Sequence, residues 1–149
     1  GCVMEKDPNG KPANTAGAKL DAGKVRPSLV LRGFARALLE VSKVGTFGAG
    51  KYTDNGWVEV PDGVKRYDEA KLRHYLAEAA GEMVDEQTGL LHAAHEAWNA
   101  LARLDLMLRE QEKAVDLGEV SDSVYLATGC ESEGLYHLGA TGKLTKCTK

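Results

Sequence analysis

The sequence predicts an all-α fold, a helical hairpin bundle completed by oligomerisation, with a small irregular or β-hairpin tail at its C-terminus. Apolar residues recur at steps of three and four through three segments between residues 28 and 118, which is the spacing of amphipathic helices. Only Gln87–Gly89 interrupts this pattern between the last two segments, so these helices should fold back as an antiparallel hairpin. Because three helices leave apolar surface exposed, we expect a homodimer or homotetramer.

The first part of the chain is predicted to be an arm followed by one helix. Residues 1–27 are rich in glycine and proline and show little periodicity, so they are expected to form an N-terminal arm. Ser28 is a suitable N-cap for a helix that runs to Val44, and Gly45 is a natural stop. The glycines that follow predict a long connection over residues 45–63.

Two further helices and a tail complete the predicted fold. The second helix is expected from Val64 to Glu86 and the third from Leu90 to Leu117, so that residues 28–118 form one helical domain. The apolar face of the second helix consists of Leu72, Tyr75, Leu76, Ala79, Ala80 and Met83. Residues 124–129 are partly repeated at 135–142, which predicts two short strands or an irregular segment within a C-terminal tail, residues 119–149.

The composition of the chain narrows its possible functions. The formal net charge is −3, so no basic surface indicates a nucleic acid or an anionic membrane as a partner. Three cysteines without metal-ligand spacing fit a reducing compartment better than a disulfide framework. No apolar run is long enough to span a membrane. We therefore expect a cytoplasmic protein that binds neither nucleic acid nor membrane.

Acidic residues form a stripe near the end of the predicted second helix. Glu78, Glu82 and Asp85 follow at helical spacing, where like charges repel by a few tenths of a kcal/mol per pair. Glu82 and Asp85 also fall at the negative end of the helix dipole. A divalent cation would offset both costs, and oxygen ligands suit Mg²⁺. The alternative is a solvated acidic helix end.

A second polar stripe lies on the predicted third helix. His92, His95 and Asn99 follow at steps of three and four within a segment otherwise rich in alanine and leucine. In an antiparallel hairpin this stripe faces the carboxylates, with Glu82 placed opposite His95. The two stripes together indicate a metal site more strongly than either stripe does alone.

Several better-known catalytic motifs are incomplete or absent in this sequence. Gly45–Lys51 matches the start of a P-loop, but Tyr52 replaces the required serine or threonine and a helix precedes the segment. His95 begins a segment like the zinc-protease helix, but Asn99 stands where the second histidine is required. The sequence also has no His-Asp dyad of the kind found in HD phosphohydrolases.

Several segments, in the right order, resemble a known family. They are Gly23-Lys24, Val44 to Tyr52, Asn55 to Trp57, Arg73-His74, Gly81 to Asp85, Gly89 to His92, and His95 to Asn99. Over residues 19–108 the chain resembles the N-terminal part of phage dATP/dGTP diphosphohydrolases, which belong to the MazG-like all-α nucleoside triphosphate pyrophosphohydrolases. It is most similar to the MazZ type, from phages that replace adenine with 2-aminoadenine.

The resemblance implies a reaction and a cofactor. It implies cleavage between the α- and β-phosphates of dGTP, or of dATP, by a catalytic domain that needs Mg²⁺ or Mn²⁺ and a second subunit. MazG-like enzymes place Glu-x-x-Glu on one helix and Glu-x-x-Asp on the next. Here Glu82 and Asp85 can supply one pair, but the other helix offers His92, His95 and Asn99 instead. Imidazole suits Mn²⁺ better than Mg²⁺, or it binds phosphate rather than metal.

These considerations give a hypothesis for each candidate residue. Glu78, Glu82 and Asp85 hold the metal, and Glu78 or Glu82 acts as the base that activates water. The remaining candidates bind substrate. Three cationic residues contact the phosphates, Asn55 contacts a purine edge, and Trp57 stacks on the base. A set of four polar residues surrounds the metal and also contacts the substrate. The cations are Lys51, Lys71 and Arg73, and the polar residues are His74, His92, His95 and Asn99. Surface charge is the alternative for the cations, and core packing is the alternative for Trp57.

Two rival functions remain open. One is a zinc hydrolase that uses Asp85, His92 and His95 as ligands. The other is a non-catalytic helical protein that uses the hairpin for dimerisation.

Overall fold

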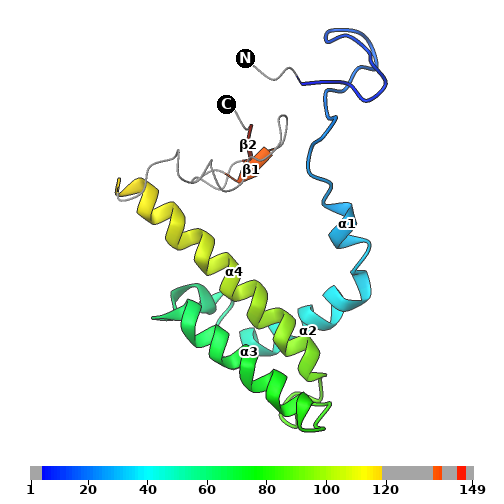
Figure 1. The fold of residues 1–149 in the computed structure, drawn as a ribbon. Helices are drawn as coiled ribbons and strands as arrows, with labels where there is room; N and C mark the ends of the chain where they lie inside the picture. The colour runs from blue at the N-terminus through cyan, green and yellow to red at the C-terminus, as the bar shows by residue number, and fades with distance from the viewer. Residues whose placement is uncertain (1–4, 119–135, 139–143, 147–149) are drawn as a thin grey trace. The chain divides into compact units, whose positions relative to one another are not determined.

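A computed structural model describes residues 5–118, 136–138 and 144–146 of the chain (Figure 1). It divides into two compact units, Pro27–Glu110 and a second unit made of Gly1–Arg26 with Gln111–Lys149. No helix within the described residues has both the length and the apolar character needed to cross a membrane. The elements of the first unit are α1 (Ser28–Leu31), α2 (Ala35–Lys51), the 3-10 helix η1 (Gly56–Glu59), α3 (Gly63–Ala79) and the start of α4 (His92–Asp116).

The first predicted helix differs from the structure in two ways. It is interrupted after Leu31, and its second part, α2, continues through Gly45 to Lys51, so the predicted glycine-rich connection begins too early. The reason is a tertiary contact, because a Cβ atom at Gly45 would lie only 3.0 Å from Nε1 of Trp98 on α4. Gly45 therefore lets α2 approach α4 and does not end the helix.

The second predicted helix ends seven residues early, at Ala79 instead of Glu86. Gly81 has a φ of +100°, and the amide of Glu82 donates to the carbonyl of Ala77 while the amide of Gly81 donates to that of Glu78. This is a Schellman motif, the usual left-handed end of a helix. Glu82 and Asp85 consequently lie in the connection to α4, and the predicted helical stripe with Glu78 is wrong.

The connection between α3 and α4 is a small hairpin of its own. The amide of Asp85 donates to the carbonyl of Leu90, the amide of His92 donates to that of Met83, and Val84 pairs with Leu91 in a β-bridge. Gly89 turns the chain with a φ of +69°. The hairpin brings Asp85 back toward the first turn of α4.

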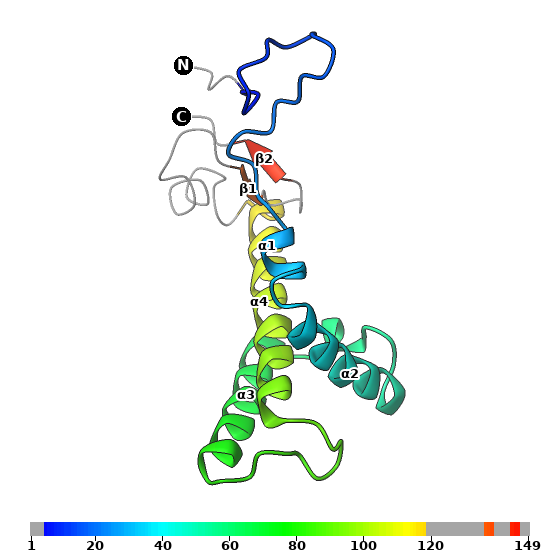
Figure 2. The same ribbon diagram turned by 90° about the vertical axis from the view of Figure 1, so that its right-hand side faces the viewer.

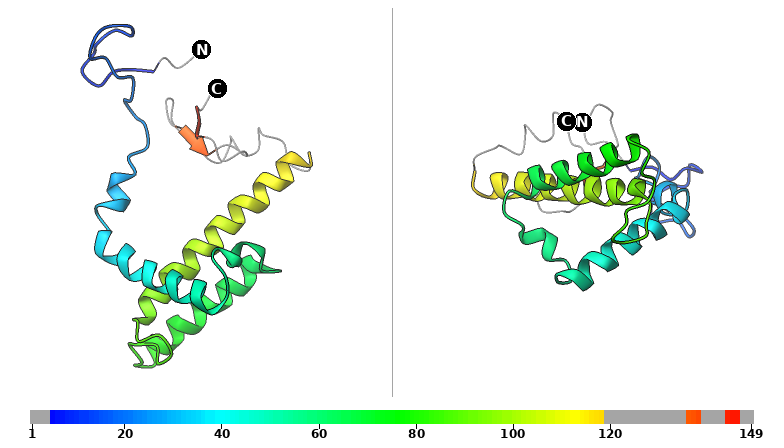
Figure 3. Two further views of the ribbon diagram at one scale, coloured as in Figure 1. Left: turned by 180° about the vertical axis from the view of Figure 1, so that it is seen from behind. Right: turned by 90° about the horizontal axis from the view of Figure 1, so that it is seen from below.

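Figures 2 and 3 show α3 alongside the first half of α4, with α2 inclined to both. The predicted apolar face of the second helix is largely exposed in α3: Leu72 is 43%, Tyr75 55% and Leu76 62% exposed. On the face of α3 that meets α4, His74 contacts His92 and His95, and Tyr67 contacts Trp98. On α4 the buried stripe is His92, Ala94, His95, Asn99, Ala102 and Leu106. At the far end of this contact, a Cβ atom at Gly63 would lie 2.7 Å from Cδ1 of Leu106.

The predicted N-terminal arm has a defined local structure within the second unit. The carboxylate of Asp7 accepts hydrogen bonds from the backbone amides of Lys19, Asn9 and Lys11, at 2.7, 2.7 and 3.4 Å. These bonds, with that from Lys19 the strongest, hold the pKa of Asp7 below its usual value. A single carboxylate thus closes a loop of about a dozen residues in an otherwise irregular segment.

The C-terminal tail contains two short strands. Strands β1 (Tyr136–Leu138) and β2 (Leu144–Lys146) pair in antiparallel register, with His137 opposite Thr145. The prediction of a strand within 135–142 agrees with β1, whereas β2 was not predicted. The strand predicted at 124–129 lies outside the described residues.

The contact at Gly45 gives a prediction about stability. Gly48 lies one turn further along α2, and a Cβ atom there would have no described atom within 4 Å. We expect Gly48→Ala to raise the free energy of unfolding by about 0.5–1 kcal/mol, because alanine is the better helix former. We expect Gly45→Ala to lower it by about 1 kcal/mol or more, because Trp98 is held by edge contacts with Trp57 and Tyr67, at centroid distances of 6.2 and 5.7 Å. Urea denaturation of both variants would test this, and a stabilised Gly45→Ala protein would contradict it.

Candidate functional site

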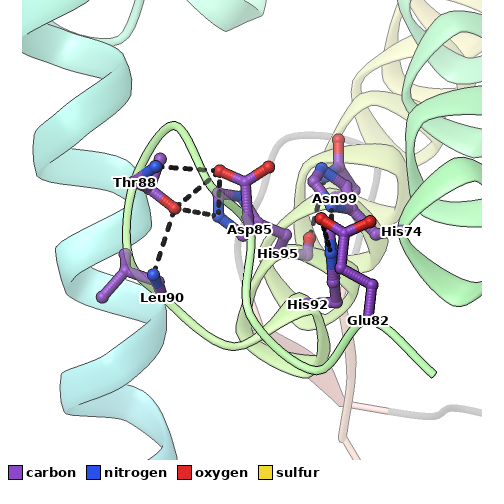
Figure 4. A network of polar contacts seen from close by, with 8 residues as sticks. All are labelled: His74, Glu82, Asp85, Thr88, Leu90, His92, His95 and Asn99. Carbon is purple, nitrogen blue, oxygen red and sulfur yellow. Dashed lines mark hydrogen bonds and ion pairs between the residues drawn. The ribbon is translucent and has the colours of Figure 1, made fainter. Parts of the chain in front are cut away.

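Polar side chains gather where α3, the connecting hairpin and α4 meet (Figure 4). We call this group the histidine cluster, and it consists of His74 from α3, Glu82, Asp85 and Thr88 from the connection, and His92 and His95 from α4.

The three imidazoles are in direct contact. The rings of His74 and His95 stack with centroids 4.4 Å apart and planes 9° from parallel. Nδ1 of His74 lies 2.8 Å from Nδ1 of His92, so one of these nitrogens donates a hydrogen bond to the other. His92 and His95 are only 4% and 7% exposed.

Burial keeps two of these rings from taking up protons easily. Burial lowers the pKa of His74, and the neighbouring His95 and His92 lower it further. The negative charge of Asp85 acts in the opposite direction and raises this pKa. Burial also lowers the pKa of His95, again opposed by Asp85. Neutral imidazole is the form that binds metal ions, so the environment of these rings favours ligation.

Thr88 connects two members of the cluster. Oδ2 of Asp85 accepts hydrogen bonds from the amide of Thr88 at 2.9 Å and from its hydroxyl at 2.8 Å. Burial alone would raise the pKa of Asp85, but these two bonds, with the nearby His95 and His74, outweigh it and hold the pKa below its usual value. Asp85 is therefore ionised at neutral pH and can only accept.

This arrangement determines the tautomer of His95. The single proton of the Thr88 hydroxyl goes to Asp85, while the oxygen accepts from the amide of Leu90 at 3.2 Å. Nε2 of His95 lies 2.8 Å from the same oxygen, so this nitrogen must carry a proton and donate. Nδ1 of the neutral His95 ring is then an acceptor.

The donor set of the cluster fits a divalent metal ion. His74, Asp85 and His92 each offer a ligand atom, and all three atoms lie within 4.8 Å of one another. Nε2 of His92 is buried and has no hydrogen-bond partner among the described residues. Oε1 of Glu82 lies 3.3 Å from this nitrogen, which is close enough for an ion pair but lacks hydrogen-bond geometry. Two imidazoles with a carboxylate are typical ligands for first-row divalent metals.

Of the three carboxylates predicted as metal ligands, Asp85 and Glu82 lie in the histidine cluster and Glu78 lies outside it. Asp85 belongs to the cluster and faces His95, with Oδ2 3.7 Å from Nε2, whereas the expected pairing of His95 was with Glu82. Glu82 instead lies beside His92 and is 52% exposed at its side chain. Glu78 is half-buried on α3, where its charge acts on Glu96 of α4.

The predicted substrate-binding residues are also divided. Nδ2 of the Asn99 side chain donates to the backbone carbonyl of His95 at 2.8 Å, so Asn99 is buried one turn beyond His95 on α4. On α3, Lys71 pairs with Asp68 at 2.9 Å and Arg73 is exposed.

The other candidates for substrate binding lie around η1. Asn55 precedes this helix with a φ of +55°, and Nζ of Lys51 lies 5.4 Å from the ring centre of Tyr52. Trp57 packs edge-on against Trp98, with the guanidinium of Arg109 5.8 Å from its ring.

Thr88 is the member of the cluster that was not predicted from the sequence. It falls in the segment taken as a break between two helices, although Asp-x-x-Thr before glycine is typical of a turn closed by its own side chains. That local pattern indicates a structured turn, but it does not indicate the contact with His95.

Removing the Thr88 hydroxyl should therefore destabilise the fold. Thr88→Val leaves the buried Nε2–H of His95 and the amide of Leu90 without an acceptor, so we expect a loss of about 1–3 kcal/mol in the free energy of unfolding. Thr88→Ser keeps the hydroxyl and should lose much less. Urea denaturation in EDTA would compare the two, and equal stability would show that the bridge contributes nothing.

Glu96 gives a prediction about pH. Burial, and then the charge of Glu78, raise the pKa of Glu96, whose Oε1 is buried without a hydrogen bond among the described residues. A carboxyl whose pKa is raised on folding favours the folded state while protonated, and this contribution is lost as the pH rises through the folded-state pKa. Glu96→Gln should thus raise the melting temperature more at pH 7 than at pH 4. A larger gain at pH 4 would contradict the assigned direction.

Comparison with known proteins identifies the family. No curated protein and no solved structure matches the chain. A family model described as dATP/dGTP diphosphohydrolase, N-terminal, matches residues 14–116, which is more than half of the chain and includes every residue of the histidine cluster. The chain therefore belongs to the dATP/dGTP diphosphohydrolase family, whose members are hydrolases.

Proposed function

We propose that this protein hydrolyses purine deoxynucleoside triphosphates, dGTP or dATP, to the monophosphate and pyrophosphate. The observation that supports this most directly is the close approach of His74, Asp85 and His92 in a chain of this family. Such a group can hold the divalent ion that diphosphohydrolysis requires.

The residues of the cluster have separate tasks in this proposal. His74, Asp85 and His92 hold the ion, which when bound neutralises charge on the phosphates. Glu82 lies beside them and is exposed enough to meet water, so it accepts a proton from the attacking water. The water oxygen bonds to the α-phosphorus as the bond to the bridging oxygen breaks, and pyrophosphate leaves with that oxygen.

The donor set bears on which metal is used. Mg²⁺ prefers an all-oxygen environment, whereas imidazole nitrogens suit Mn²⁺ and Zn²⁺. We therefore favour Mn²⁺ over Mg²⁺. A zinc hydrolase is the second candidate function, because two histidines and an aspartate are also a common zinc ligand set.

We also propose that the protein acts as a homodimer or homotetramer. Leu72, Tyr75 and Leu76 form an exposed apolar stripe on α3, and no side chain among the described residues is fully buried. A core this shallow gains stability if another subunit covers the stripe.

The cellular role we propose follows from the product. Hydrolysis of dGTP would supply dGMP for synthesis of the 2-aminoadenine nucleotide in a phage with modified purines, in the host cytoplasm. The net charge of −3 gives no reason to expect nucleic acid as a partner.

Asp85→Asn gives the clearest test of the reaction, with Glu86→Gln as its control, because Glu86 is an exposed neighbour in the same hairpin. Pyrophosphate release from each dNTP would be measured with Mg²⁺, Mn²⁺ or Zn²⁺, and Mn²⁺ affinity by titration. We expect release of pyrophosphate and not of triphosphate, strongest with dGTP. Asp85→Asn should weaken metal affinity and activity by about 10–100-fold or more, while Glu86→Gln retains both. Equal activity of the two variants would refute the role of Asp85, and activity with Zn²⁺ alone would favour the second candidate.

A further inference from the structure

A groove of about 510 Å³ lies between α2 and the connecting hairpin. The α2 side consists of Leu39, Ser42, Lys43, Thr46 and Phe47, and the opposite side consists of Thr88 and Leu90. We propose that this groove binds the purine base of the substrate. The proposal deepens the proposed function and rests on it for the identity of the ligand.

The position of the groove relative to the histidine cluster is the first argument. Thr88 lines the groove, and its hydroxyl oxygen also lies 2.8 Å from both Asp85 and His95. A nucleotide with its base in the groove therefore has its phosphates within reach of the cluster. Thr88 therefore lies between the groove and the proposed site of the reaction, and its side chain borders both.

The apolar walls suit a flat aromatic ring. Leu39 is 65% and Phe47 38% exposed, so both side chains present carbon surface to the groove while remaining part of α2. An exposed phenyl ring offers a stacking face to any base. Leu90, on the opposite side, closes the groove with a second apolar contact.

Two hydroxyl groups of the groove, those of Ser42 and Thr46, favour a base that carries an amino group. The Ser42 hydroxyl donates to the carbonyl of Leu38 at 2.6 Å, and the Thr46 hydroxyl donates to the carbonyl of Ser42 at 2.8 Å. Because each hydroxyl has used its only proton, both oxygens can only accept further bonds. The amino groups of guanine and adenine are donors, so they match these acceptors.

A second groove, of about 470 Å³, is less suitable. It lies between α2, η1 and α4, and Trp57 and Trp98 are its aromatic residues. These two rings already pack edge-on against each other, and Asp105 is paired with Arg109 at 2.6 Å. None of the residues that line this groove belongs to the histidine cluster. We therefore assign the stacking role, predicted for Trp57, to Phe47.

The test uses the two phenylalanines of the chain as a matched pair. Phe34, 59% exposed, lies outside the groove and provides the control. The dissociation constant of dGMP would be measured in EDTA by calorimetry for wild type, Phe47→Ala, Phe47→Trp and Phe34→Ala. We expect Phe47→Ala to weaken binding about tenfold and Phe47→Trp to retain it, since tryptophan also stacks. Phe34→Ala should bind as wild type does, and Mn²⁺ affinity should be unchanged in every variant.

The amino-group contact has its own test. Hypoxanthine differs from guanine only in lacking the 2-amino group, so wild type should bind dIMP more weakly than dGMP. Thr46→Val removes the acceptor and should reduce that difference. An unchanged preference for dGMP in Thr46→Val would overturn this part of the proposal.

The outcomes separate this proposal from the function on which it rests. If wild type binds dGMP in the groove but releases no pyrophosphate from any dNTP, the reaction is wrong and the base site stands. If wild type hydrolyses dGTP but Phe47→Ala binds dGMP as well as Phe34→Ala does, the base site is wrong. A change of oligomeric state in Phe47→Ala, seen by size-exclusion chromatography with light scattering, would show that the groove is a subunit interface and would also overturn it.

Discussion

The pair of hydrogen bonds that Asp85 accepts from Thr88 is the interaction on which the candidate site depends. It closes the hairpin between α3 and α4 and aligns the Asp85 carboxylate with the first turn of α4. The same hydroxyl holds His95 in one tautomer, and His95 in turn supports the stacked ring of His74. A turn of a few residues therefore positions side chains from both helices. These short-range hydrogen bonds can form because α3 ends at the left-handed Gly81, so the residues after it are available to form a hairpin.

The contact between α3 and α4 reverses the usual arrangement of an amphipathic hairpin. Three imidazoles and a carboxylate occupy the position where aliphatic side chains would ordinarily pack, while Leu72 and Leu76 point outward. Burying these polar groups is unfavourable unless each finds a partner. Most of these groups find a partner through the hydrogen bonds between His74 and His92 and between His95 and Thr88. Nε2 of His92 has no hydrogen-bond partner among the described residues, and a bound metal ion would provide one. The orientation of α3 places His74 at the contact with α4 and leaves Leu72 and Leu76 exposed.

The sequence predicted some of these features and missed others for physical reasons. The bounds of α4 were predicted to within two residues because its periodicity is long and Gly118 follows it. The end of α3 was missed because the carboxylates beyond Gly81 continue the helical spacing although the chain has already turned. Gly45 was taken as a stop because its contact with Trp98 depends on tertiary packing that periodicity does not contain. Spacing also singled out Glu78, Glu82 and Asp85 as metal ligands and His74, His92 and His95 as polar groups around them, and the structure brings all of these except Glu78 into the histidine cluster. Which of them touch, and the part played by Thr88, follow from the conformation of one turn.

Helix α2 links the site to the rest of its unit. Ser42 lines both grooves, so a single helix separates the packed tryptophans from the surface proposed to bind the base. The position of α2 is set on one side by Gly45 against Trp98, a contact that allows no additional carbon atom without displacement. A shift of α2 toward or away from α4 would therefore alter the width of the base groove while leaving the histidine cluster, which belongs to α3, the hairpin and α4, in place. The proposed base groove lies mainly on α2 and the candidate metal ligands mainly on α3 and α4, while the connecting hairpin contributes to both, through Thr88 and Leu90 to the groove and through Asp85 to the ligands.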